Sequence, residues 1–190
     1  NRPYGERLHH QVEPAVWRRI EVPGDVTLAR LHAIIQRVMG WEDYHMWSFQ
    51  VGKTEYQTGS GEMFDFGDGP RARSPAGTTL EQATQGRRIS FRYWYDFGDD
   101  WFHAIKVERV ADPEPGAIYP RCLEGARACP PEDCGGPMGY YRLLVALSDP
   151  DHEEHDVDPE NGVLHGGADC LIRPARPSSE FPPARTRRPP

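Results

Sequence analysis

The amino-acid sequence predicts a single α+β domain of mixed, largely antiparallel strands packed with two main helices and long loops. Three observations support this fold class. Two neighbouring segments alternate between apolar and polar residues around a short Asp- and Gly-rich turn, another segment carries apolar residues at helical spacing, and the 190 residues include 19 Gly and 19 Pro. Alternation is typical of half-buried strands, and frequent Gly and Pro divide a chain into short elements joined by turns.

The first periodic segments are a strand and a helix. Residues 15–22, AVWRRIEV, are predicted to form a strand in which Arg18 and Ile20 share one face and Trp17 points to the other. Residues 27–39 are predicted to form the clearest helix, with Asp25 or Thr27 as its cap and a left-handed Gly40 at its end. Six apolar residues form the stripe of this helix: Leu28, Leu31, Ile34, Ile35, Val38 and Met39.

The middle of the chain predicts a second strand, a loop and a hairpin. Residues 45–51 form the strand, and 59–77 form a loop that ends near Thr79, where a short helix can start. The alternating runs 88–95 and 101–110 are predicted to pair as a β-hairpin, because Asp and Gly in the turn between them accept positive φ and cap their own backbone.

The last part of the chain is expected to hold less regular structure. Residues 111–138 are rich in Pro, Gly and Cys, and a helix is predicted at 139–147, after Pro137. Residues 173–190 hold six Pro and five Arg with one Glu, so they lack the apolar surface needed to offset ordering and are expected to be disordered. We therefore expect one domain at 1–172 and a disordered tail at 173–190.

Charge and hydropathy exclude some classes of function. The formal net charge of −7 argues against general DNA binding, which depends on Lys and Arg neutralising phosphates. No stretch approaches the roughly 20 apolar residues that span a bilayer, so we expect a cytoplasmic protein without a membrane partner. Its four cysteines are expected to be reduced thiols rather than disulfides.

Several long segments occur together in an order that resembles a known family. They are PAVWRRIEVP, LHAIIQRVMGWEDYHMWSF, YWYDFGDDWFH, and CLEGARACPPEDCGG followed by GYYRLL, and they extend from about residue 14 to about residue 154. The chain resembles the root-inducing-plasmid (pRi) ORF-three-like family, whose members are often labelled transposon or insertion-sequence passenger proteins of TnpR type. The resemblance implies a bacterial α+β protein associated with mobile elements, and it implies no particular activity.

Two features depart from that family pattern, and one label does not fit. Only LHHQV, residues 8–12, stands where the family has a further N-terminal strand, and the segment after the charged run 149–158 looks replaced or frameshifted. A serine recombinase needs a nucleophilic Ser among arginines and a basic helix-turn-helix. This acidic chain shows neither in recognisable form, so we do not expect a true serine resolvase.

The tip of the predicted hairpin is the first candidate for chemistry. Asp96 and Asp99 lie close together in the turn, and His103 follows on the return strand. Carboxylates with an imidazole can hold a divalent metal or act as acid and base, and His45 and Glu132 are further candidates for the same centre. The alternative is that the Asp side chains cap the turn while His103 packs among aromatic residues.

Other candidates lie outside the hairpin. Asp43 is positioned to orient His45, unless that His only closes a turn. Cys134 is a candidate metal ligand or low-pKa thiol, with a small buried hydrophobe as the alternative. His152 and His155 have a spacing that would let them share a helical face and bind a metal, but the favoured interpretation is a solvated acidic helix end.

These patterns leave several functions open. The first is a non-catalytic binding or accessory module with a protein partner linked to mobile elements, in which the candidate binding residues are Trp17, Trp41, Trp101 and Arg18. The alternative is a metal-dependent hydrolase-like enzyme that uses a divalent cation at the hairpin tip. A third hypothesis is that Arg18, Arg19 and Arg92 bind a small anion or nucleotide.

Overall fold

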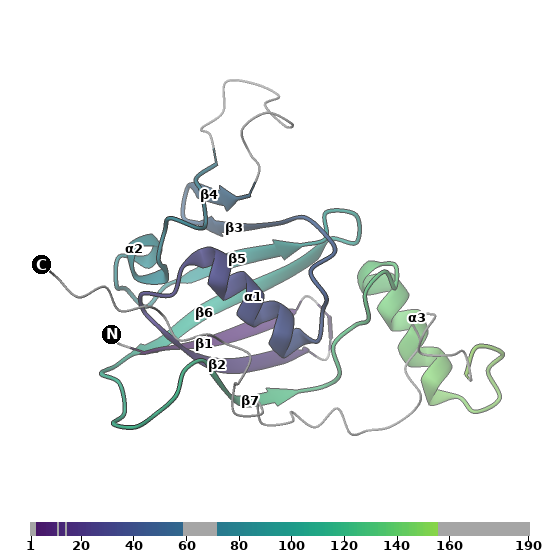
Figure 1. Cartoon of the computed structure of the whole chain (residues 1–190). Coiled ribbons are helices and arrows are strands. Elements are labelled where there is room, and N and C mark those ends of the chain that lie inside the picture. Colours follow the sequence, from purple (N-terminus) through teal and green to yellow (C-terminus); the bar gives the residue numbers. More distant parts are fainter. Residues whose placement is uncertain (1–2, 11, 14, 59–71, 156–190) are drawn as a thin grey trace, which may run out of the picture.

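The computed structural model describes residues 3–10, 12–13, 15–58 and 72–155, with the side chains described from residue 12 onward. One seven-stranded sheet with the order β4-β3-β5-β6-β1-β2-β7 organises the chain (Figure 1). Every neighbouring pair of strands is antiparallel. Helices accompany this sheet, so the predicted α+β class is confirmed.

The elements have the following bounds. The strands are β1 Pro3–His10, β2 Trp17–Pro23, β3 Trp47–Val51, β4 Thr54–Gln57, β5 Ser90–Tyr95, β6 Trp101–Val110 and β7 Arg121–Ala126. The helices are α1 Leu28–Met39, α2 Leu80–Thr84 and α3 Gly136–Ser148. The predicted tail at 173–190 lies outside the described residues, as does the loop segment 59–71.

The elements with the strongest local patterns form where the sequence predicts them. Helix α1 begins after Thr27, whose hydroxyl accepts a hydrogen bond from the backbone N–H of Arg30 at 3.2 Å. It ends at Gly40, whose φ of 82° is the left-handed conformation that glycine adopts without strain. Strands β5 and β6 form the predicted hairpin, with Tyr95 opposite Trp101 at its closed end.

Three strands differ from the prediction. Strand β1 spans eight residues between β6 and β2, so the N-terminal strand is longer than the remnant expected at 8–12. Strands β4 and β7 form the two edges of the sheet and were not predicted. Both are short, with four and six residues, and β7 has no fully buried side chain, so neither displays a clear alternation.

Helix α3 begins at Gly136, three residues before the predicted start at 139. Pro137 is in its first turn, where the missing N–H of proline breaks no intrahelical hydrogen bond. Figure 1 shows α1 lying across one face of the sheet, and α3 placed to the side, past the ends of the strands. Among the described residues, no helix has the length and apolar character needed to cross a membrane.

The core lies between α1 and the sheet face that it covers. Its largest fully buried side chains are aromatic: Trp101, Tyr93, Tyr95 and Phe49. These residues come from β3, β5 and β6. Successive side chains in a strand alternate between the two faces of a sheet, so every second residue of these strands faces α1. Burying each of them removes roughly 150–250 Å² from water, which makes aromatic packing the main contribution to this core.

A closed polar network crosses the core beneath α1. His32 donates from Nε2 to Asp43 Oδ1 at 2.7 Å and accepts at Nδ1 from the Tyr93 hydroxyl at 2.7 Å. Gln36 donates to the same hydroxyl at 3.0 Å and accepts from the backbone N–H of Asp43 at 3.0 Å. Burial lowers the pKa of His32 below its ordinary value of 6.5, although Asp43 opposes this shift. The imidazole is therefore held neutral in the folded protein.

This network predicts that the protein loses stability on acidification. Unfolded His32 takes up a proton near pH 6.5, whereas the folded chain resists it, so the unfolded state binds more protons below that pH. The free energy of unfolding should fall as pH drops below about 6.5, by at most about 1.4 kcal/mol per pH unit from this residue. Urea denaturation at a series of pH values measures this slope. His32→Gln should flatten it, and an unchanged slope in that variant would contradict the assignment.

Candidate metal centre

The β5–β6 turn positions the first member of a charged cluster. Asp96 ends β5 with a φ of 54°, a left-handed conformation that Asp tolerates better than most residues. Its Oδ1 accepts hydrogen bonds from the backbone N–H groups of Gly98 at 2.9 Å and Asp99 at 3.3 Å. These bonds fix the carboxylate, and its other oxygen, Oδ2, lies 3.6 Å from the imidazole of His45.

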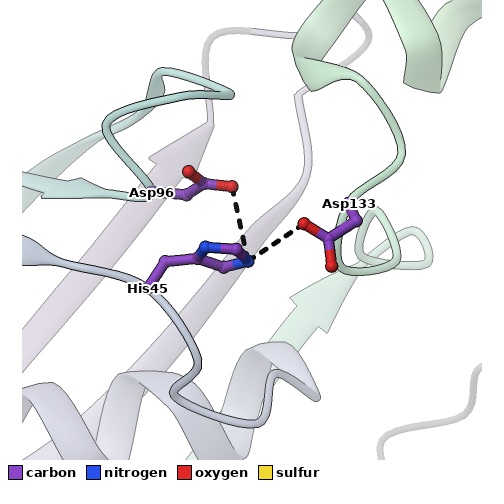
Figure 2. Close-up of side chains that lie close together, drawn as sticks. All are labelled: His45, Asp96 and Asp133. Atoms are coloured by element: carbon purple, nitrogen blue, oxygen red, sulfur yellow. Dashed lines mark ion pairs between the residues drawn. The ribbon is translucent and has the colours of Figure 1, made fainter.

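His45 is at the centre of this cluster. It lies in the segment between α1 and β3, with its ring edge against Tyr95 at a centroid distance of 5.8 Å. Its Nε2 lies 3.1 Å from Asp133 Oδ1, 3.6 Å from Asp96 Oδ2 and 3.9 Å from Glu132 Oε2. Figure 2 shows Asp96 and Asp133 approaching this nitrogen from separate segments.

The loop before α3 supplies the remaining carboxylates. Glu132 is held by its Oε1, which accepts from the Tyr95 hydroxyl at 2.8 Å and from the backbone N–H of Glu42 at 2.9 Å. Burial, and then the hydrogen bond to Glu132, raise the pKa of Tyr95 above its ordinary value of 10.0, so the phenol remains a neutral donor. The second oxygen of Glu132 is consequently left facing His45.

Close contact between the loop and the hairpin tip holds the cluster together. Asp99 Oδ2 accepts from the backbone N–H of Gly135 at 3.0 Å. Gly136 has a φ of 67°, and a Cβ added there would lie 2.6 Å from the Asp99 carbonyl oxygen. Only glycine permits this approach of the two backbones, which brings Asp133 to the end of β5.

Two buried atoms of the cluster lack hydrogen-bond partners. They are His45 Nε2 and Glu132 Oε2, and neither forms a hydrogen bond within the described part of the chain. Leaving such groups buried and unsatisfied is costly, which favours a cation or water between them. The separations of 3.1–3.9 Å from Nε2 to the three carboxylates bracket the ~3.4 Å expected between ligands of a tetrahedral metal with bonds of about 2.1 Å. One imidazole with carboxylates suits a borderline divalent cation such as Zn²⁺ or Mn²⁺.

Three of the five predicted catalytic candidates meet in this cluster: His45, Asp96 and Glu132. The other two do not. Asp99 points to Gly135 and supports the loop, and His103 is buried on the sheet face that α1 covers, edge-on to Trp41 at 5.3 Å. In this structure Asp99 and His103 therefore lie outside the cluster that contains His45. In β6, residue 103 alternates in phase with Trp101 and Ile105, which places its side chain in the core.

The other predicted ligands also lie elsewhere. Asp43 pairs with His32 rather than orienting His45. Burial, followed by the charge of Asp99, raises the pKa of the Cys134 thiol to about 12, which opposes the low-pKa thiol considered for this residue. His155 donates from Nδ1 to the carbonyl of Ala146 at 3.0 Å, so it closes the turn after α3.

The predicted binding residues are mostly internal. Trp41 and Trp101 are buried and lie next to each other, with ring centroids 6.2 Å apart, so they form no binding surface in this structure. Trp17 is half-buried, with the Arg19 guanidinium over its ring at 5.8 Å. Arg18 is 4% exposed and donates to the backbone carbonyls of Val38, Ala126 and Arg127, while Arg19 pairs with Glu108 and Glu124. Neither arginine is free to bind an anion.

Comparison with known proteins places this architecture in a family. Residues 8–160 match the family model described as plasmid pRiA4b ORF-3-like protein. The chain belongs to this family. The matched range includes the four residues of the cluster, which are His45, Asp96, Glu132 and Asp133. The match confirms the resemblance seen in the sequence motifs.

Two relatives of this ORF-3-like chain are similar over most of their length. The chain is 43% identical over 145 residues to the uncharacterized protein y4hQ of Sinorhizobium fredii, covering 76% of this chain and 72% of that protein. It is 34% identical to the protein of unknown function MM3350 from Methanosarcina mazei Go1, whose crystal structure superposes with a TM-score of 0.70. That match covers 81% of this chain and 84% of MM3350.

Asp133 is the cluster residue of this ORF-3-like protein that sequence reasoning missed. A signal was available in the segment PPEDCGG, where Asp precedes a Cys and two glycines. Such a segment makes a tight bend, and Asp133 itself adopts a φ of 54°.

Proposed function

We propose that this ORF-3-like protein binds a divalent metal ion at His45, Asp96 and Asp133, and uses it to hydrolyse an ester or phosphoester bond. The observation that carries the proposal is the pair of buried atoms, His45 Nε2 and Glu132 Oε2, that face each other without hydrogen-bond partners among the described residues. A cation held by His45, Asp96 and Asp133 would give His45 Nε2 a partner and offset the repulsion among the carboxylates, and a water on that cation would donate to Glu132 Oε2.

The ligand set supports hydrolysis because three protein ligands leave a coordination position for water, as in catalytic zinc sites. Asp133 has 71% of its side chain exposed, so the centre opens to solvent on the side of the loop before α3. A metal held by these residues would supply a more acidic water, and Glu132 Oε2, 3.9 Å from His45 Nε2, is placed to accept its proton. Glu132 would then return the proton to the leaving oxygen as the ester or phosphoester bond breaks.

A second candidate is the non-catalytic module with a protein partner. An exposed apolar face on α3 favours it: the residues are Met138 at 67%, Val145 at 59%, Leu144 at 38% and Tyr141 at 37% exposure. Apolar surface concentrated on one helix is typical of binding faces rather than of ordinary solvated helices. In that case the metal would stabilise the loop before α3 and carry no reaction. Association with mobile elements belongs to the same proposal.

Metal analysis and activity distinguish the two candidates. Protein purified without chelators is expected to contain about one equivalent of a divalent metal, measured by elemental analysis, or to bind one equivalent of Zn²⁺ or Mn²⁺ in calorimetric titration. Hydrolysis of nitrophenyl esters and phosphates, lost with EDTA and restored by the metal, would support the enzyme. Stoichiometric metal without turnover would favour the binding module. A protein that contains no metal and shows no saturable metal binding would contradict the metal centre itself.

A further inference from the structure

A second candidate site lies at the other end of the sheet. It is a cavity of about 330 Å³ between the β3–β4 turn, the end of α2 and the segment leading into β5. Figure 1 shows α2 and the β5–β6 turn at opposite ends of the sheet. The six residues of β5 separate the cavity from the metal centre by about 20 Å, at roughly 3.3 Å per residue. The cavity is therefore independent of the proposed hydrolytic site.

The walls of this cavity are positively charged, in contrast to the protein as a whole. Lys53, Arg73 and Arg87 line it, and among the residues that the structure describes no Asp or Glu does. Glu55 lies between two lining residues of β4, Thr54 and Tyr56, but successive side chains of a strand point to opposite faces. Within the described ranges, none of the three cations forms an ion pair with a carboxylate.

Like charges gathered around a concave surface repel one another, and their field is concentrated there. Three arginines of the strands, by contrast, pair with glutamates: Arg19, Arg109 and Arg121. A chain with a net charge of −7 thus has three cations at one cavity that pair with no carboxylate of the described residues. An anion of charge −2 would offset this repulsion.

Neutral groups of the cavity also suit a ligand. The amide side chains of Gln82 and Gln85 line it, and Gln82 uses its oxygen to cap α2, which leaves its NH₂ group as a donor. Gln85 ends α2 with a φ of 55° and turns the chain back, so that Arg87 reaches the same cavity. Tyr56 and Ile89 provide apolar wall. The volume is at the lower end of the roughly 300–1,000 Å³ typical of small-molecule sites.

From these observations we infer that the cavity binds a small molecule carrying a phosphate group. Arginine presents a planar fork of N–H donors that matches phosphate oxygens in pairs, and lysine adds a point charge. The phosphate would lie among Lys53, Arg73 and Arg87, and the organic part of the ligand would lie against Tyr56 and Ile89. Neither the metal centre nor the predicted Arg18, Arg19 and Arg92 takes part in this site.

Calorimetric titration of the full chain with AMP, inorganic phosphate and adenosine tests this inference. AMP and phosphate are expected to bind saturably, with affinities that weaken as salt is raised, whereas adenosine should not bind measurably. Arg87→Gln should weaken AMP binding by about tenfold or more, because a charge-assisted hydrogen bond is lost. Arg88→Gln is the matched control. Arg88 is adjacent to Arg87 and exposed but does not line the cavity, so this substitution should leave the affinity unchanged.

The outcomes separate the site from general charge effects and from the metal centre. Equal losses in Arg87→Gln and Arg88→Gln would overturn the inference, as would adenosine binding as tightly as AMP or an absence of saturable phosphate and AMP binding. The titrations are carried out in EDTA, which removes metal-bound phosphate as an explanation. Thermal unfolding of each variant confirms that a lost affinity does not reflect a lost fold. A failure of the metal centre would leave these expectations unchanged.

Discussion

Replacing Asp96 with Asn is expected to weaken Zn²⁺ binding by about two orders of magnitude or more while the fold is retained. The substitution keeps a carbonyl oxygen to accept from the backbone N–H groups of Gly98 and Asp99, which hold the turn. It removes the charged oxygen that lies 3.6 Å from His45 Nε2. Disturbing only the groups behind a metal ligand costs about 10–100-fold in affinity, so loss of a ligand should cost at least as much.

Competition with a chromophoric chelator measures this affinity, and urea denaturation in EDTA measures the stability of the metal-free chain. Asp100→Asn is the matched control, because Asp100 is in the same turn, is exposed and has a φ of 56°, which Asn also tolerates. Its metal affinity should equal that of the wild type. If both variants lost affinity equally, or Asp96→Asn bound Zn²⁺ normally, Asp96 would not be a ligand.

The second large effect is expected from Arg18→Met, which should lower the free energy of unfolding by about 4 kcal/mol. The guanidinium of Arg18 donates to the carbonyl oxygens of Val38 at 3.1 Å, Ala126 at 3.1 Å and Arg127 at 3.0 Å. It therefore connects β2 to the last turn of α1 and to the end of β7. Methionine fills much of the same space without donors, and each partly buried carbonyl that loses its donor costs on the order of 1 kcal/mol or more.

Equilibrium urea denaturation measures this loss, and Arg19→Met provides the comparison. Arg19 is adjacent in β2 but faces the other way, with its side chain 29% exposed, and pairs with Glu108 at 2.9 Å. Exposed ion pairs contribute at most about 1 kcal/mol, so this variant should remain close to the wild type. Since domains of this size are stable by about 5–15 kcal/mol, the Arg18 variant loses a large share of its stability. Equal effects at the two positions would contradict the assigned role of Arg18.

The elements that could be predicted are those whose signal is local. The apolar stripe of 27–39 with Thr27 and Gly40 at its ends predicts α1, and the alternation around the Asp-rich turn predicts the β5–β6 hairpin. Both depend on residues a few positions apart. The edge strands β4 and β7 could not be predicted in this way, because an edge strand is defined by its single neighbour in the sheet and these two lack a regular alternation.

The candidate site could be predicted only in part, for a related reason. Chemistry-bearing residue types are visible in sequence, and three of the predicted residues, His45, Asp96 and Glu132, are close together in the structure. Their distances are not visible, because the members come from segments about 40–50 residues apart. Asp133 gains its role from the close approach of Gly136 to the hairpin tip, and His103 loses its predicted role to packing under α1.

Short-range periodicity and long contiguous motifs were therefore enough to predict the α+β class, the main helix, the hairpin and the family. Which side chains of the hairpin face the core, and which face the loop before α3, depends on how the elements pack. That choice follows from the sheet register and from backbone contact across the turn, which no single segment specifies. The hairpin tip is a turn capped by its own Asp96, and the same residue contributes its second oxygen to the candidate metal centre.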